Sequence, residues 1–186
     1  MIMNPKDAVR MARNVEIKAR VRNFDIVRQK AAALADKLPE IIEQEDVFFQ
    51  SSCGRLKLRQ LAPNTGQLIH YERPDVSGPK TSTYSISYTD NPSQLRNVLA
   101  SALGETTIVK KVREVYLVGQ TRIHLDVVEG LGVFIELEVV LGVEEADLSG
   151  QNTAYEVMAE LGIEQSDLIE GAYADLIEMN IKSLDC

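Results

Sequence analysis

Several stretches of this sequence place a charged side chain at every second position, with apolar residues between them. Residues 14–20 read NVEIKAR, residues 55–59 read RLKLR, and residues 136–138 read ELE. Successive side chains of a β-strand point to opposite faces, so each stretch predicts a strand with one ionic and one apolar face. Basic residues fill the middle stretches, and carboxylates occur in the first and last. This sorting of charge indicates a site for a polyanion together with a metal ion.

The basic residues at these alternating positions form the larger of two candidate sites. If they converge, their mutual repulsion requires an anion of several charges, and a phosphate chain meets that requirement. Arginine offers paired donors to phosphate oxygens, and lysine adds a point charge. The predicted phosphate-binding residues are Lys18, Arg20, Arg55, Lys57, Arg59, Arg73, Lys111, Arg113 and Arg122. Alternation alone leaves open a solvated outer sheet face with cross-strand ion pairs.

Four carboxylates form the second candidate site and are predicted to bind a divalent metal: Glu16, Asp126, Glu136 and Glu138. Oxygen ligands with room for water and substrate phosphates suit Mg²⁺, and Mn²⁺ is tolerated as well. Alternatively, each carboxylate pairs with a neighbouring arginine, although two like charges on one strand face disfavour each other without a cation. His124 shares the ionic face and is a candidate substrate contact, whereas His70 is out of phase and is predicted at the surface.

Composition and charge exclude several classes of protein. With 45% apolar and 26% charged residues, the 186-residue chain is typical of a soluble globular domain. Its net charge of −8 argues against binding a nucleic-acid polymer, although eleven of the 28 acidic residues follow residue 142. The apolar runs are too short for a bilayer span, so no membrane association is expected. Cys53 and Cys186 are isolated, which predicts a reducing, cytoplasmic location.

Hydrophobic periodicity and turn residues predict the order of elements. Strands are expected at 14–22, 43–50, 55–61, 67–73, 81–88, 106–118, 121–129 and 132–141, and helices at 24–37, 92–103, 152–162 and 166–180. Strands in consecutive hairpins are antiparallel, and eight of them suffice to close a small barrel. The predicted fold class is α+β, an eight-stranded antiparallel β-barrel with flanking helices. Residues 1–12 are predicted to be a flexible leader and residues 13–182 a single domain.

Taken in order, these motifs resemble the CYTH superfamily of triphosphate tunnel metalloenzymes, which includes class IV adenylate cyclases and thiamine triphosphatases. Residues 14–20 resemble the family's opening ExExK strand, residues 54–59 its phosphate-binding strand and residues 134–138 its closing metal strand. The resemblance implies an eight-stranded triphosphate tunnel. It matches Glu16 and Lys18 to the second Glu and the Lys of ExExK, and Glu136 and Glu138 to the closing acidic pair. Asn14 stands where the first Glu belongs, so one metal-binding carboxylate is lost.

The charged residues and the resemblance together predict a metal-dependent enzyme that binds inorganic, thiamine or nucleoside triphosphate and hydrolyses it. Hydrolysis requires a base near the terminal phosphate, for which Lys57 and Tyr71 are the candidates. Tyr71 is otherwise expected to pack, like Tyr84, Tyr88 and Tyr116. One alternative is a class IV adenylate cyclase that makes cyclic AMP from ATP, and a second is a noncatalytic triphosphate- or nucleotide-binding protein. A third is an interaction protein whose acidic helices after residue 142 bind a basic partner or a second copy, which would permit a homodimer.

Overall fold

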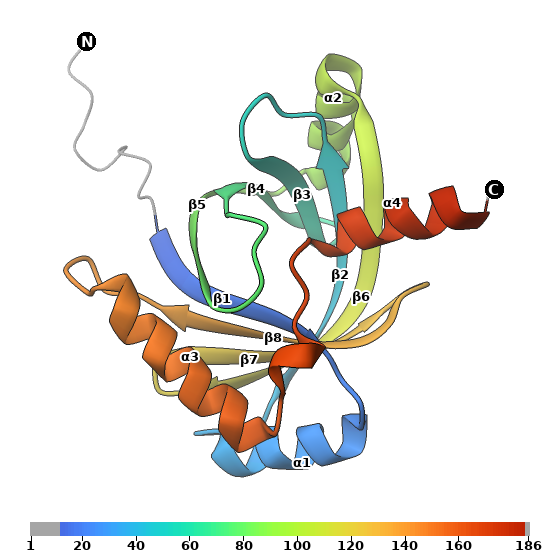
Figure 1. The fold of residues 1–186 in the computed structure, drawn as a ribbon. Coiled ribbons are helices and arrows are strands. Elements are labelled where there is room, and N and C mark those ends of the chain that lie inside the picture. Colours follow the sequence, from blue (N-terminus) through green and yellow to red (C-terminus); the bar gives the residue numbers. More distant parts are fainter. Residues whose placement is uncertain (1–11, 185–186) are drawn as a thin grey trace.

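A computed structural model describes residues 12–184 of the chain (Figure 1). The strands are β1 (Ala12–Arg20), β2 (Glu40–Phe49), β3 (Arg55–Ala62), β4 (Thr65–Glu72), β5 (Lys80–Thr89), β6 (Glu105–Val118), β7 (Thr121–Val128) and β8 (Gly132–Val140). The helices are α1 (Phe24–Leu34), α2 (Pro92–Leu103), α3 (Asp147–Leu161) and α4 (Tyr173–Leu184), with a 3₁₀ turn, η2 (Gln165–Asp167), before α4. Apart from Ala12, where β1 begins, the predicted leader lies outside the described residues. None of the helices within residues 12–184 is long and apolar enough to cross a membrane.

The strands close into one antiparallel barrel in the order β1-β5-β4-β3-β2-β6-β7-β8, which confirms the predicted fold class. Hairpins connect the consecutive strands β2, β3, β4 and β5, and likewise β6, β7 and β8. The helices α1 and α2 instead connect strands that are not paired with each other. β1 closes the barrel because it pairs with β5 on one side and with β8 on the other. A barrel of eight strands encloses a space wide enough for side chains or one small ligand.

Local sequence signals set the start of the first two helices. The side chain of Asn23 accepts a hydrogen bond from the backbone N–H of Ile26 and caps α1. Asn91 caps α2 through the N–H of Gln94, and Gly104 ends that helix with a φ of 79°. Both helices therefore begin where the sequence predicts, although α1 already ends at Leu34.

The main apolar core lies outside the barrel wall, under α1 and α3. On β1, Val15, Ile17 and Ala19 are at most 1% exposed. Ile17 and Ala19 pack in one cluster with Val27 of α1 and Leu161 of α3, and Figure 1 shows both helices on this side of the barrel. Because neighbouring side chains of a strand point to opposite faces, this packing directs the alternating polar residues of β1 into the barrel.

α3 is longer than predicted and approaches β1 closely. Asp147, in its first turn, accepts hydrogen bonds from Arg13 at 2.8 Å and from Thr81 at 2.6 Å, which fixes the helix start to two strands. A Cβ atom at Gly150 would lie only 2.8 Å from a methyl group of Val15. The absence of a side chain at residue 150 therefore allows the close contact between α3 and β1.

The helix predicted at residues 166–180 is wrong in its first half. Residues 165–167 form η2, and the following residues are extended because Leu168 bridges to Ala19 of β1. The N–H of Ile169 donates to the carbonyl of Lys18 at 2.8 Å, and α4 starts only at Tyr173. Pairing with β1 thus overrides the helical periodicity of this segment.

The late start of α4 places Tyr173 against the barrel interior. Its side chain is 5% exposed and packs on Phe134, with ring centres 5.1 Å apart. Phe48, Val109 and Val128 complete this apolar cluster. Tyr173, Phe48 and Val109 also line the cavity described below, so the cluster bounds the cavity on the side of α4.

Candidate active site inside the barrel

The barrel encloses a cavity of about 400 Å³, a size typical of small-molecule sites. Ten of the predicted phosphate and metal ligands line it: Glu16, Lys18, Lys57, Arg59, Arg73, Lys111, Arg113, Arg122, Glu136 and Glu138. These charged residues face the interior and do not coat the outside of the barrel, while their roles as ligands stay predictions. Tyr71, Tyr84 and Tyr88 also line the cavity, whereas Tyr116 is packed in the core as expected.

Three predicted ligands, Arg20, Arg55 and Asp126, do not line this cavity. Arg20 is exposed at the end of β1. Arg55 forms ion pairs with Asp75 and Asp175, at 2.7 and 2.9 Å. Both arginines therefore lie beside the site rather than in it. His70, predicted at the surface, is half-buried and also lies outside the cavity.

Asp126 is fully buried on the inward face of β7, where it pairs with the cavity-lining Arg113 and orients it. Its carboxylate accepts two hydrogen bonds from Arg113, at 2.7 and 2.6 Å, and one from the hydroxyl of Tyr173 at 2.8 Å. Burial opposes the charged carboxylate, but the guanidinium outweighs this and holds the pKa of Asp126 far below its usual value. These contacts fit a positioning role for Asp126.

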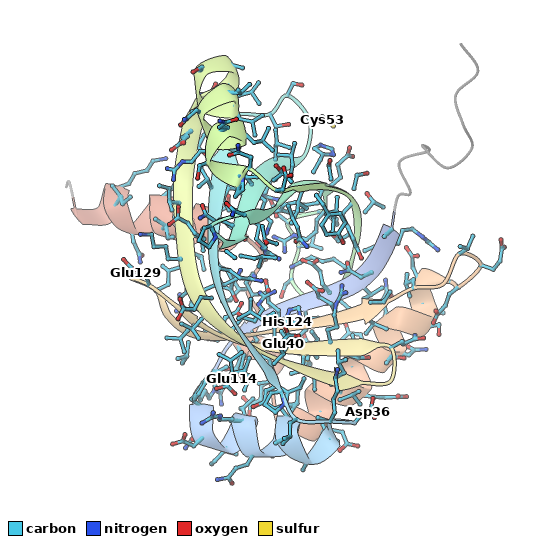
Figure 2. All side chains as sticks on the ribbon, turned by 180° about the vertical axis from the view of Figure 1, so that it is seen from behind. Asp36, Glu40, Cys53, Glu114, His124 and Glu129 are labelled. Atoms are coloured by element: carbon cyan, nitrogen blue, oxygen red, sulfur yellow. The ribbon has the colours of Figure 1, made fainter. Side chains whose placement is uncertain are left out.

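Glu136, Glu138 and His124 form a group of candidate metal ligands. One ligand atom from each lies within 4.8 Å of the others, and His124 Nδ1 is 3.9 Å from Glu136 and 3.8 Å from Glu138. Strand pairing sets this group, since His124 of β7 lies opposite Glu136 of β8. Figure 2 shows His124 near the middle of the molecule, among crowded side chains. Glu136 also contacts Lys18 and Arg113, which balance its charge.

The protonation states of this group suit a divalent cation. Burial, followed by the charge of Arg113, lowers the pKa of His124 to about 3, so the imidazole is neutral at neutral pH. Burial opposes the charge of Glu138, but His124, Arg122 and Arg113 outweigh it and hold the carboxyl pKa below its usual value. The carboxylate of Glu138 and the neutral imidazole of His124 are therefore available as ligands, beside the carboxyl group of Glu136.

Buried polar atoms without hydrogen-bond partners gather in this cavity. Within the described chain there are four such side-chain atoms: Asn14 Oδ1, Gln44 Oε1, Arg73 Nε and His124 Nδ1. All four residues line the cavity. Because native proteins satisfy nearly all buried polar groups, this concentration indicates a place where a ligand, an ion or water completes the bonding.

Asp46 is the charged residue of the cavity that the sequence analysis misses. It is 1% exposed, and its carboxylate lies 2.9 Å from Lys57, 2.7 Å from Arg59 and 3.7 Å from Lys111. Burial opposes its charge, but these three cations outweigh burial and hold the pKa of Asp46 well below its usual value. The sequence pattern does not single out Asp46, because residues 43–46 read EQED and place polar side chains on both faces of β2.

Burial has opposite consequences for the two candidate bases. It lowers the pKa of Lys57 to about 8, assisted by Arg59, so the neutral amine forms just above neutral pH. It raises the pKa of Tyr71 above its usual value, which disfavours the phenolate that a base would need. Of the two, Lys57 is the better candidate.

Comparison with known proteins places this barrel in a family. Residues 12–173 match the CYTH domain. The chain belongs to the CYTH family. A protein of Methanocaldococcus jannaschii named "Putative adenylate cyclase MJ0240" is 25% identical to this CYTH protein over 175 residues, which are 87% of this chain and 97% of the relative.

Solved structures show the same CYTH fold. The PH1012 protein from Pyrococcus horikoshii has a TM-score of 0.78 at 25% identity, and the match covers 88% of this chain and 98% of that one. HpAC1 from Hippeastrum, described as a "putative adenylyl cyclase" that reveals a dominant triphosphatase activity, has a TM-score of 0.59 at 18% identity, covering 86% and 91%. At that identity, the second likeness concerns the fold alone.

The cavity of this CYTH protein has a formal excess of two positive charges when all of its lysines and arginines are protonated. Burial lowers the pKa of Lys18 and of Lys111 well below the usual value, so a bound anion would favour their charged forms. The cationic side chains are seven: Lys18, Lys57, Arg59, Arg73, Lys111, Arg113 and Arg122. The anionic side chains are five when Asp126, which pairs with Arg113, is included: Glu16, Asp46, Asp126, Glu136 and Glu138. Most of these charges are paired, for example Arg73, which follows β4, with Glu16 at 2.5 Å, and Arg122 of β7 with Glu138 of β8 at 2.7 Å. A net anionic ligand would therefore balance the cavity.

Proposed function

We propose that this protein is a divalent-metal-dependent enzyme that binds a triphosphate inside the barrel and hydrolyses it. The observation that carries this proposal is the convergence, in one cavity, of the positive excess with all four unpartnered buried polar atoms of the described chain. A triphosphate with one bound divalent cation carries about two negative charges, which matches the excess in size and is opposite in sign.

The cationic side chains would hold the phosphate chain. Arg59, Lys57 and Lys111 meet around Asp46, and Arg73 keeps an unpartnered Nε. Guanidinium and ammonium groups that are fixed in position stabilise the charge that develops during phosphoryl transfer. Lys57 is mostly protonated at neutral pH, so we assign it first to phosphate binding, with a role as base as the alternative.

Glu136, Glu138 and His124 would hold the metal, with Glu16 and the amide oxygen of Asn14 as further oxygen ligands from β1. The unpartnered Nδ1 of His124 and Oδ1 of Asn14 support this assignment, because both are buried and line the cavity. When bound, Mg²⁺ or Mn²⁺ supplies charge neutralisation and orientation of the phosphate oxygens. Mn²⁺ accepts an imidazole ligand more readily than Mg²⁺ does, so we expect activity with Mn²⁺ at least equal to that with Mg²⁺.

A second candidate reaction is the formation of cyclic AMP from ATP, which the name of the Methanocaldococcus jannaschii relative suggests. It requires the ribose 3′-hydroxyl to attack the α-phosphorus in place of water attacking the terminal one. The noncatalytic alternative keeps phosphate binding without turnover, since Asn14 replaces a carboxylate. A homodimer and a cytoplasmic location also stay predictions.

One assay separates these functions. The purified protein is incubated with ATP, inorganic triphosphate and thiamine triphosphate, with Mg²⁺, with Mn²⁺ or with EDTA, and the products are resolved by ion-exchange chromatography. Orthophosphate released only with metal supports the hydrolase, and cyclic AMP with pyrophosphate supports the cyclase. Binding of triphosphate without any product supports the noncatalytic protein. Absence of both binding and turnover for all three compounds would overturn the proposal.

A further inference from the structure

Tyr173, the first residue of α4, contacts charged groups from three strands of the barrel. Its hydroxyl donates to the carboxylate of Asp126 at 2.8 Å. The Nζ of Lys18 lies over its ring at 3.6 Å from the ring centre, and the Nζ of Lys111 lies over the ring at 5.2 Å. Because the face of an aromatic ring carries partial negative charge, it attracts both ammonium groups. One side chain of α4 thus interacts with charged residues of β1, β6 and β7.

The ring is important to the two lysines because burial removes most of their water. Lys18 is 3% exposed and Lys111 is 7% exposed. Lys111 lies 3.7 Å from its ion-pair partner Asp46, beyond hydrogen-bond distance, and Asp46 already accepts hydrogen bonds from two other cations. A cation–π contact is stronger where water is excluded, so the ring of Tyr173 partly replaces the water that these ammonium groups lose.

The chain before α4 fixes the ring beside Lys18. The backbone N–H of Ile169 donates to the carbonyl of Lys18 at 2.8 Å. The ammonium group of Lys80 donates to the carbonyl of Ile169 at 3.3 Å, which holds the same segment to β5. Lys18 therefore contacts the segment that leads into α4 twice, through its backbone with Ile169 and through its ammonium group with Tyr173.

The hydroxyl of Tyr173 connects the same residue to a third cation. Asp126, which accepts a hydrogen bond from this hydroxyl, also accepts two from Arg113, and Arg113 lines the cavity. Asp126 is fully buried, so removal of the hydroxyl would leave part of a buried carboxylate without its donor. The ring and the hydroxyl together therefore act on three of the cations of the cavity.

We propose that Tyr173 is a positioning residue for phosphate binding. Its ring holds the ammonium groups of Lys18 and Lys111 at the cavity wall, and its hydroxyl supports the pair of Arg113 and Asp126. The inference rests on the proposed function, because it concerns the same phosphate site. It adds a residue of α4 to a site that otherwise consists of residues on the strands and of Arg73.

The first test measures the affinity for inorganic triphosphate by isothermal titration calorimetry, with Ca²⁺ in place of Mg²⁺ to slow turnover. Tyr173→Leu removes the ring and should weaken binding about tenfold, or about 1.4 kcal/mol, within the range of a desolvated cation–π contact. Tyr173→Phe keeps the ring and should bind within about threefold of wild type. This rescue by the conservative variant separates the ring from the hydroxyl.

Tyr116 provides the matched control, because it is a second buried tyrosine whose hydroxyl donates to a carboxylate. It is 1% exposed in the core outside the cavity, and its hydroxyl lies 2.6 Å from Glu114. Tyr116→Leu and Tyr173→Leu should both lower the thermal unfolding temperature. Only Tyr173→Leu should weaken triphosphate binding. Tyr173→Met takes the place of Tyr173→Leu if that variant does not fold, because Met adapts to irregular core spaces.

The second test is a double-mutant cycle between Tyr173→Leu and Lys18→Met. If the ring acts through the lysine, the weakening caused by Tyr173→Leu should shrink from about tenfold to about threefold in the Lys18→Met background. A purely structural role predicts no such coupling, so additive effects would overturn the inference.

Other results also decide the inference. Wild-type affinity in Tyr173→Leu, or equal weakening by Tyr173→Leu and Tyr173→Phe, would overturn the role of the ring and leave the proposed function intact. Failure of the wild-type protein to bind inorganic triphosphate would instead count against the proposed function, and the inference would fall with it.

Discussion

The two faces of β1 differ in how completely their side chains are satisfied. On the outer face, Val15 and Ile17 are at most 1% exposed and packed in apolar clusters. On the inner face, the amide oxygen of Asn14 has no hydrogen-bond partner, while Glu16 and Lys18 form ion pairs with residues from other parts of the barrel. One strand therefore contributes stability through one face and an incomplete polar site through the other.

This difference shows which side chains of β1 stabilise the fold and which do not. Buried ion pairs are seldom net stabilising, because removing charges from water costs about as much as their attraction returns. The apolar core outside the wall must then stabilise the barrel, while the cavity retains charges for a ligand. Substitutions on the two faces should accordingly change different measured quantities.

The largest expected effect is on the inner face, at Glu136. Glu136→Gln keeps the size of the side chain but removes a charge from the proposed metal group, so we expect kcat to fall by about 100-fold or more. Steady-state kinetics with varied Mg²⁺ and Mn²⁺ measures this. Glu114→Gln is the control, because Glu114 of β6 pairs with Arg28 away from the cavity, at 3.0 Å. Undiminished metal-dependent turnover in Glu136→Gln would contradict the assignment.

Asp46 offers a sharper form of the comparison, because it is an inner-face anion that holds three cations. Asp46→Asn should lower the free energy of unfolding by about 3 kcal/mol without ligand, since Lys57, Arg59 and Lys111 lose their counter-charge. Inorganic triphosphate should restore more stability in the variant than in wild type. Urea unfolding with and without triphosphate measures both quantities.

Glu45→Gln provides the matched control on the opposite face of β2. Glu45 pairs with Arg96 at 3.1 Å and with Lys110 at 3.6 Å near the surface, so its loss should cost less than about 1 kcal/mol. Triphosphate should stabilise Glu45→Gln and wild type equally. The role of Asp46 would be refuted if the two variants responded alike.

A conservative change on the outer face should have the opposite signature. Ile17→Val removes one methyl group from the fully packed cluster under α1 and α3, and we expect a loss of about 1 kcal/mol in unfolding free energy. KM and metal dependence should stay as in wild type. A shift in KM beyond about twofold would show that the two faces are not independent.

The smallest expected effect is a change in pH dependence. Because the pKa of Lys57 is lowered to about 8, its positive charge is present below that pH and lost above it, so kcat/KM for triphosphate should decline above about pH 8. Lys57→Arg retains the charge and should move this decline to higher pH. Lys110→Arg is the control, because Lys110 is next to Lys111 in the sequence but its side chain is half-exposed. An increase of activity through pH 8 in wild type would indicate that Lys57 acts as a base instead.

Much of the fold and the cavity lining could be predicted because the period of two is a local property. Alternation at residues 14–20, 55–59 and 136–138 identified three strands and the residues that share each face, without knowledge of their neighbours. Alternation alone left open whether the ionic face turns inward, and closure of the barrel decides this. The helix caps at Asn23 and Asn91 are local as well. Roles that depend on one stretch of chain were therefore accessible from sequence.

The remainder depends on contacts between distant segments. Whether Asp126 faces a metal or a guanidinium is decided by the β6–β7 register, which sets it opposite Arg113. The start of α4 is decided by the bridge between Leu168 and Ala19. The helical periodicity of the segment does not predict this contact. The partners of Asp46 come from β3 and β6, on either side of β2. Such pairings follow from closure of the barrel.

The position of β1 in the barrel has a consequence for biosynthesis. β1 is the first strand of the described chain, but both strands that pair with it, β5 and β8, are translated later. Contacts between residues so far apart in sequence form slowly, so Glu16 meets Glu138 only after residue 138 has left the ribosome. A nascent chain interrupted before β8 would leave one edge of β1 unpaired, with its hydrogen-bonding groups open to another chain. Closure of the barrel around its cavity is thus tied to translation of β8.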